Sequence, residues 1–175
     1  TTPHHKKRTM HEMISEIPSE QEQAARLWKG VEQRCKTHPQ EAGRMDCRGR
    51  TCLHVACTKN PPASVVTALI AASVRHSEAV QERDKHGNTP LALAVTSQNV
   101  GCSVAVIRRL LQSCPRAAAV SDHNGFLPLH IACRKYHEGR QEIAEALLDA
   151  YPQGAARVCN SGSTPLHCAI EGGNS

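Results

Sequence analysis

The segment DHNGFLPLHIAC, residues 122–133, combines a turn signal, a proline and a histidine, and most of it recurs along the chain. The copies are GRTCLHVAC at 49–57, GNTPLALAV at 87–95, GFLPLHIAC at 125–133 and GSTPLHCAI at 162–170. Successive copies start 38, 38 and 37 residues apart in a chain of 175 residues. A fixed period of this length is typical of an array in which each repeat is one supersecondary unit.

Each copy opens with a predicted turn. An aspartate stands three residues before the glycine in the first three copies, and a cysteine takes its place in the fourth. The pairs are Asp46 with Gly49, Asp84 with Gly87, Asp122 with Gly125 and Cys159 with Gly162. Aspartate at the first position and glycine at the fourth favour a type I turn, because the carboxylate accepts backbone amides and glycine tolerates a positive φ.

A helix is predicted directly after each turn. The residues that suit its N-cap are Thr51, Thr89 and Thr164, and those that suit its first position are Pro90, Pro128 and Pro165. A second helix is indicated by apolar residues spaced three and four apart, such as Val104, Ile107 and Leu111. The repeating unit is therefore a turn followed by two helices.

These motifs resemble the ankyrin repeats, whose usual phrase is a glycine, any residue, and then T-P-L-H at the start of an alanine-containing helix. The resemblance covers residues 20–175. It implies an all-α solenoid of stacked helix-turn-helix units with short hairpin-like finger loops. It also implies that His54, His130 and His167 hydrogen-bond to the backbone of an adjacent finger.

The repeats depart from the usual ankyrin phrase in length and at three positions. Their period exceeds the customary value of about 33 residues, and we assign the extra residues to the turn between the helices and to lengthened loops such as 151–160. Cys52 replaces the proline, Ala92 the histidine and Leu127 the threonine cap. Loss of a cap costs about 1 kcal/mol, which stacking against neighbouring repeats can offset.

The repeat register divides the chain into three parts. Residues 1–18 are expected to be a flexible basic leader that can contain a short helix, and residues 19–38 an N-terminal capping half-repeat. The repeats then occupy 39–76, 77–114, 115–151 and, as a partial repeat, 152–175.

Two observations concern the ends of the array. Trp28 lies 11 residues before Pro39, as Val104 lies before Pro115, so the half-repeat takes a second-helix position, and Ser19 with Glu22 predicts a capping box at its start. The last repeat lacks its second helix. We therefore expect that the parent protein continues past Ser175 or that a partner covers this end.

Composition limits the class of protein. The formal net charge of +5 favours an acidic partner. The nine cysteines are odd in number, form no CxxC pair and fall mostly within apolar helical patterns, so we expect them to be reduced in the cytoplasm, the nucleus or an organelle matrix, not in a secreted protein. No apolar run approaches the length of a membrane span, and we expect no membrane insertion.

The histidines and cysteines raise the question of metal or nucleophile chemistry. Cys52, His54 and Cys57 lie close in sequence, but their spacing matches no zinc module. A cysteine and a histidine could still meet in space as a nucleophile pair. Small apolar packing is the simpler explanation for these cysteines. We therefore expect no catalytic residue, no metal and no cofactor.

The positions that vary between repeats lie at the finger tips and at the ends of the first helices, on the side through which ankyrin-like proteins usually bind. We call this set the basic row: Arg48, Arg50, Lys59, Lys85, His86, Asn88, His123, Asn124, Phe126, Arg134 and Lys135. We expect it to bind an acidic protein segment, with Phe126 as the apolar anchor and the cations setting register and encounter rate. The alternative is that these charges only solvate the surface.

The sequence as a whole favours a non-catalytic module for protein–protein interaction or assembly. Two alternatives stay open: a structural subunit of a large, for example organellar, complex, and a regulatory arm of a longer enzyme. Nucleic-acid binding is disfavoured, because few aromatic residues are present to stack on bases.

Overall fold

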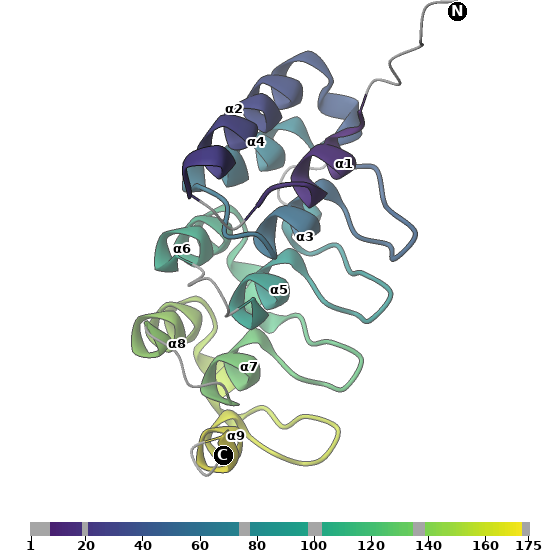
Figure 1. Cartoon of the computed structure of the whole chain (residues 1–175). Helices are drawn as coiled ribbons and strands as arrows, with labels where there is room; N and C mark the ends of the chain where they lie inside the picture. Colours follow the sequence, from purple (N-terminus) through teal and green to yellow (C-terminus); the bar gives the residue numbers. More distant parts are fainter. Residues whose placement is uncertain (1–7, 19–20, 74–77, 98–102, 135–138, 173–175) are drawn as a thin grey trace, which may run out of the picture.

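The computed structural model describes residues 8–18, 21–73, 78–97, 103–134 and 139–172, and every regular element in these ranges is a helix. The α-helices form two columns (Figure 1). The inner column contains α1 (Met10–Ser15), α3 (Cys52–Cys57), α5 (Pro90–Thr96), α7 (Pro128–Arg134) and α9 (Pro165–Gly172). The outer column contains α2 (Gln21–Thr37), α4 (Ala63–Ala72), α6 (Val104–Ser113) and α8 (Arg140–Ala150). Each helix contacts the next helix of its own column, so the predicted all-α solenoid is confirmed.

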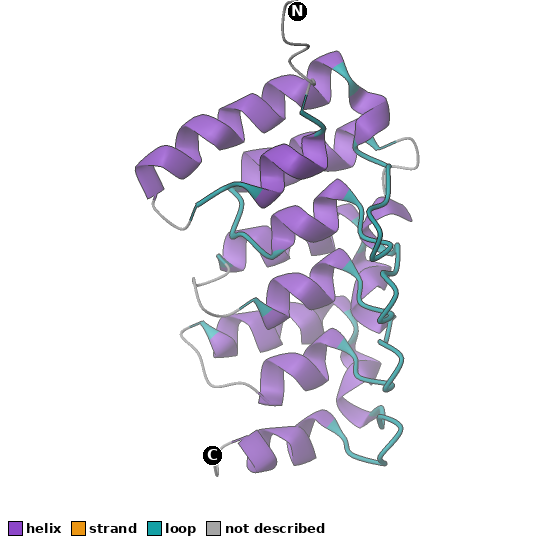
Figure 2. Ribbon diagram, turned by 45° about the vertical axis from the view of Figure 1, so that its right-hand side comes forward, coloured by secondary structure: helices purple, strands orange, loops and turns teal. Residues whose placement is uncertain are grey.

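A loop projects from the array before each of the helices α3, α5, α7 and α9 (Figure 2). We call these loops fingers 1 to 4; they cover residues 46–50, 84–88, 122–126 and 159–163. In finger 1, Asp46 Oδ1 accepts the backbone N–H of Arg48 at 2.8 Å and that of Arg50 at 2.9 Å. The aspartates of fingers 2 and 3 accept the corresponding pairs of amides. The carboxylates therefore hold the fingers in shape.

The glycine of each finger adopts the left-handed conformation that the turn requires. The values of φ are +72° at Gly49, +79° at Gly87, +79° at Gly125 and +80° at Gly162. Backbone hydrogen bonds then join successive fingers. Lys85 N donates to Arg48 O at 3.0 Å, His123 N to His86 O at 3.4 Å and Asn160 N to Asn124 O at 3.0 Å. The four glycines thus stand along one edge of the molecule.

The starts of the inner helices follow the sequence motif. Pro90, Pro128 and Pro165 are the first residues of their helices, and the Thr89 hydroxyl accepts the Ala92 amide. Leu127 has no hydroxyl to act as a cap. Its own amide instead donates to His130 Nδ1 at 3.2 Å, as the Thr51 amide does to His54 Nδ1 at 3.1 Å.

The extra residues after the outer helices form turns of 3-10 helix and not only longer loops. These are η1 (Pro39–Glu41), η2 (Glu78–Val80), η3 (Pro115–Ala119) and η4 (Pro152–Ala156). Ala117 and Ala118 of η3 are buried and pack in the core. These alanine side chains are small enough to pack closely against the helices, so the segment folds as a buried turn. The number of extra residues alone does not predict this conformation.

The short helix that the sequence allowed within the N-terminal leader is present as α1, but it is buried and is not part of a flexible segment. Helix α1 has a capping box between Thr9 and Glu12, and Met10 and Ile14 are fully buried in the core. It packs against α3 and α2, so α2 lies in the second-helix position assigned to residues 19–38 and α1 is the inner helix paired with it. The correction applies to residues 8–18, since residues 1–7 and the predicted capping box at Ser19 lie outside the described residues.

Glu41 ties this helix pair to the first repeat. Its carboxylate accepts the Met10 amide at 3.0 Å and two bonds from the Arg34 guanidinium at 3.1 and 2.8 Å. The Arg34 hydrogen bonds hold the pKa of Glu41 below its ordinary value. One carboxylate thus links α1, α2 and η1.

The helices of the described segments are too short or too polar to span a lipid bilayer. They build a core from small and medium side chains. Leu53, Leu69, Leu91, Ile107 and Leu110 are all almost completely buried.

The finger glycines allow a stability test with an internal control. A methyl group on Gly87 would lie 2.8 Å from the backbone nitrogen of His123, whereas one on Gly162 would meet no atom within 4 Å. Both residues have nearly the same positive φ. We expect Gly162→Ala to cost roughly 1–2 kcal/mol in the free energy of unfolding. Gly87→Ala should cost clearly more, because finger 3 must also shift. Urea denaturation of both variants measures the difference; equal losses would contradict the close finger packing.

Candidate functional site

The basic row divides into exposed, half-buried and undescribed residues. Its exposed members are Arg48, Lys59, Lys85, His86, His123, Asn124 and Arg134. Arg50, Asn88 and Phe126 are half-buried, and Lys135 lies outside the described residues. The finger members project from one side of the array (Figure 2). Lys59 instead follows the far end of α3, where its ammonium group donates to Ile17 O at 3.4 Å.

Two half-buried members of the basic row, Arg50 and Asn88, have interaction partners within the array itself. The Arg50 guanidinium forms an ion pair with Asp46 at 2.8 Å, and the Arg50 carbonyl contacts His11 Nε2 at 2.9 Å. Asn88 reaches Asp84 with its side-chain amide at 3.4 Å, and its carbonyl accepts from His54. The sequence placed both residues in the basic row, because these hydrogen-bond and ion-pair partners cannot be identified from the sequence.

Phe126 forms a small cluster with two residues of α7. The Phe126 ring meets the His130 ring edge to face, with centroids 5.8 Å apart and planes at 75°. Arg134 Cζ lies 5.9 Å from the Phe126 centroid, which is the range of a cation–π contact. We call Phe126, His130 and Arg134 the aromatic cluster. It presents an apolar ring and a cation side by side. The ring is partly covered, whereas an anchor residue was expected to be freely exposed.

The finger tips present exposed cations, and the carboxylates of the fingers are directed into the turns. Burial pushes the pKa of Asp46 up, but hydrogen bonds from Arg50 and Arg48 outweigh it and leave this pKa below its ordinary value. The finger aspartates are therefore engaged within their own turns. Neither Arg48 nor Lys85 forms an ion pair with any residue that the structure describes. Both cations face solvent on neighbouring fingers.

The buried histidines of the repeat phrase connect neighbouring repeats. His54 Nδ1 accepts the Thr51 amide, so its Nε2 carries the proton and donates to Glu82 O and Asn88 O, each at 3.1 Å. His130 Nε2 likewise donates to Ser163 O at 3.1 Å. The role that the resemblance implied for His54 and His130 is confirmed. Ala92 cannot make this bond, and Arg83 instead donates to the carbonyl of Ser121.

The structure brings one cysteine and one histidine together. Cys52 Sγ lies 3.3 Å from His11 Nδ1 and donates to Glu41 O at 3.5 Å. Burial raises the pKa of Cys52 to about 12, and burial likewise raises the pKa of Cys35 to about 11. A thiol is nucleophilic only as the thiolate, so this environment suits a packed cysteine and not a nucleophile. The described residues contain no cluster of three potential metal ligands.

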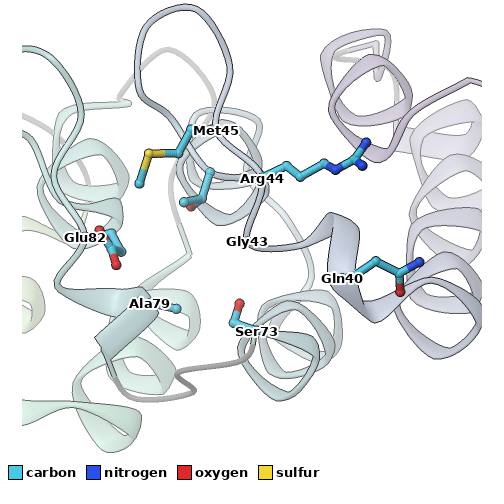
Figure 3. Close-up of a pocket in the computed structure, with 8 residues that line it drawn as sticks. Gln40, Gly43, Arg44, Met45, Ser73, Ala79 and Glu82 are labelled. Carbon is cyan, nitrogen blue, oxygen red and sulfur yellow. The ribbon is translucent and has the colours of Figure 1, made fainter.

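A pocket of about 310 Å³ is lined by residues outside the basic row (Figure 3). Its lining comes from η1, the stretch between η1 and finger 1, the end of α4 and the region of η2, and includes Gln40, Met45, Ser73 and Glu82. The side chain of Arg44 points away from Met45 and Glu82. Sequence reasoning missed this pocket, because it depends on how two linkers fold and carries no motif.

The buried histidines predict a specific pH dependence of stability. Burial lowers the pKa of His54 and of His130, despite opposing backbone hydrogen bonds. The unfolded chain therefore binds protons below about pH 6.5 that the folded chain does not bind, and stability falls as pH falls through this range. The lowered pKa values of Glu41 and Asp46 act only in more acidic solution, below about pH 4.5.

We expect the Tm to fall by several degrees between pH 7.5 and pH 5.0 in thermal scans. His130→Gln should be less stable than the parent at pH 7.5 but lose less on acidification. His167→Gln provides the matched control, because it makes the same substitution at the exposed histidine of the last repeat phrase. A His130→Gln slope equal to that of the parent would contradict a buried neutral imidazole.

Comparison with protein families agrees with this geometry. A family model for ankyrin repeats (3 copies) matches residues 22–114 and 99–175. No curated protein matches the chain. Ankyrin repeats are generally protein–protein interaction modules and are typically non-catalytic. The match spans most of the chain, and the fingers, helix pairs and bridging histidines occur in the same register: the chain belongs to the ankyrin repeat family.

Proposed function

We propose that this protein is a non-catalytic interaction module that binds an acidic protein segment along fingers 1 to 3 and the aromatic cluster. The observation that carries the proposal is the pair of exposed cations Arg48 and Lys85 on neighbouring fingers, which form no ion pair within the described residues. The finger carboxylates accept amides of their own turns and pair with neither cation. An acidic ligand would therefore meet positive charge at a fixed spacing, which favours fast association and one register.

The aromatic cluster supplies the apolar part of the same surface. Interface energy usually concentrates in a few aromatic and arginine residues that become buried on binding. Phe126 and Arg134 already contact each other in the free protein. Binding would thus require little additional ordering of these side chains, which lowers the entropy cost of association. We expect the bound segment to combine carboxylates with at least one apolar side chain.

Charge reversal tests the electrostatic part of the proposal. Peptides selected from a random displayed library on the wild-type protein should be enriched in Asp and Glu. For such a peptide, Arg48→Glu with Lys85→Glu should raise Kd by about 10-fold or more at low salt, measured by fluorescence anisotropy. The Tm should change little, since both side chains are exposed.

The control places the same change in charge on the outer column. Arg26→Glu with Lys29→Glu alters two exposed cations of α2. This variant should bind the selected peptide nearly as well as the wild type. Peptides without acidic enrichment, or equal losses in the two double variants, would refute the proposal.

Truncation of the aromatic anchor should have a different signature. Phe126→Ala is expected to weaken peptide binding by about 10-fold or more, because a central aromatic contact is lost. This loss should hardly depend on salt, whereas the loss from charge reversal should shrink as salt screens the cations. Kd measured at low and high salt separates the two contributions. A Phe126→Ala variant that folds normally and binds like the wild type would show that the ring is not an anchor.

A further inference from the structure

The pocket of Figure 3 leads from the surface of the protein to buried residues. Its floor contains Thr51, Ser73 and Ala79, which are all buried, and its rim contains the exposed residues Gly43 and Met45. Its volume of about 310 Å³ lies near the lower limit, about 300 Å³, that is usual for the sites of whole small molecules. One long side chain of a partner therefore suits this pocket better than a larger ligand.

Glu82 places a carboxylate without a partner in the wall of the pocket. The residue is half-buried, and its carboxylate forms no ion pair or hydrogen bond with any residue that the structure describes. Only its backbone carbonyl is engaged, as an acceptor for His54 Nε2. Attraction between opposite charges strengthens where water is displaced. A cation that enters the pocket would therefore gain more from Glu82 than from a carboxylate in open solvent.

The side-chain donors around the pocket are directed elsewhere. The Ser73 hydroxyl donates to a carbonyl of α4 at 2.8 Å, and the Thr51 hydroxyl donates to Nδ1 of the α3 histidine at 2.8 Å. The side chains of Gln40 and Arg44 extend away from Glu82 (Figure 3). The described lining thus offers a carboxylate acceptor and no side-chain donor aimed at a ligand. This arrangement favours a cationic ligand over an anionic one.

Apolar groups stand beside this carboxylate. Met45 and Ala79 lie on the same side of the pocket as Glu82 (Figure 3). Met45 is 54% exposed, and the flexible methionine side chain can adapt to an aliphatic partner. Lysine and arginine lay their aliphatic stems along apolar surface and direct the charged head to a polar partner. A basic side chain therefore matches both parts of the lining.

We propose that this pocket, which we call the Glu82 pocket, binds one lysine or arginine side chain of a partner protein segment. The cationic head pairs with the Glu82 carboxylate, and the stem contacts Met45 and Ala79. A protein segment also covers the exposed part of Met45, which a free amine inside the pocket would leave in solvent. Residues 74–77 lie outside the described residues and are not included in the site. The inference does not rest on the acidic ligand, because the pocket shares no residue with the basic row.

NMR of the methionine methyl groups tests the proposal with defined probes. The chain has three methionines, Met10, Met13 and Met45, and only Met45 lines the pocket. A capped pentapeptide with lysine at its centre and glycine elsewhere should shift the Met45 signal saturably, with a Kd of the order of millimolar or below. The same peptide with norleucine keeps the stem but lacks the charge, and it should bind at least about 5-fold more weakly. Butylamine should also bind more weakly than the lysine peptide.

Two variants separate the charge of the pocket from its shape. Glu82→Gln should weaken binding of the lysine peptide by about 5-fold or more, with little change in Tm, because the carboxylate has no partner to lose. The matched control is Glu78→Gln, which removes the same charge from an exposed residue of η2 outside the lining and should bind like the wild type. A methyl group on Gly43 would meet no atom within 4 Å, so the fold should tolerate Gly43→Leu. This variant narrows the rim and should lose binding although Glu82 is present.

Four results would overturn the proposal. The first is a lysine peptide that gives no saturable shift of Met45, or a norleucine peptide that binds as tightly. The second is an equal loss of binding in Glu82→Gln and Glu78→Gln, which would indicate general charge attraction. The third is wild-type binding by Gly43→Leu, since the cation would then lie outside the pocket. The fourth is butylamine binding as tightly as the lysine peptide, which would identify a free amine as the ligand.

Discussion

The register of the array depends on one buried interaction: a neutral histidine that donates to a carbonyl at the next finger. His54 and His130 are completely buried, and each bridges two repeats through Nε2. A buried polar group without a partner costs about 1–3 kcal/mol, so each histidine fixes where the following finger lies. The backbone bonds between fingers then set the spacing of the tips. Stacking, finger position and the presentation of surface charge thus follow from the same constraint.

This constraint also explains how two cations come to lie on neighbouring fingers. Each of the first three fingers contains an aspartate, and each aspartate is engaged by amides of its own turn. Formation of the finger therefore directs the carboxylate into its own turn and leaves Arg48 and Lys85 facing solvent without an ion-pair partner among the described residues. The fold and the proposed binding surface cannot be separated, because a change that disrupts a turn also moves the neighbouring cation.

Local signals made much of the fold predictable. The Asp and Gly of the first three turns and the prolines at the helix starts act within a few residues, so a repeated phrase reveals them. The bridging histidines contact the next repeat, but they recur at a fixed place in the phrase and so are revealed with it. The sequence allowed a short helix within residues 1–18, but the place of α1 in the inner column could not be predicted, because it lacks the phrase and depends on burial of Met10 and Ile14 and on the distant Glu41. The site was predictable only in outline. The ion pair of Arg50 and the partial covering of Phe126 depend on side-chain contacts that composition and spacing do not encode.

The most direct test of the account is the exchange of the imidazole protons of His54 and His130 in solution. NMR of the folded protein at neutral pH should show a slowly exchanging Nε2–H for each residue, with Overhauser contacts to Asn88 and to Ser163, respectively. These signals would establish that the repeats of His54 and His130 are each held by a carbonyl at the next finger. If both imidazoles instead exchange with water as fast as a solvent-exposed histidine, the proposed basis of the repeat register is wrong.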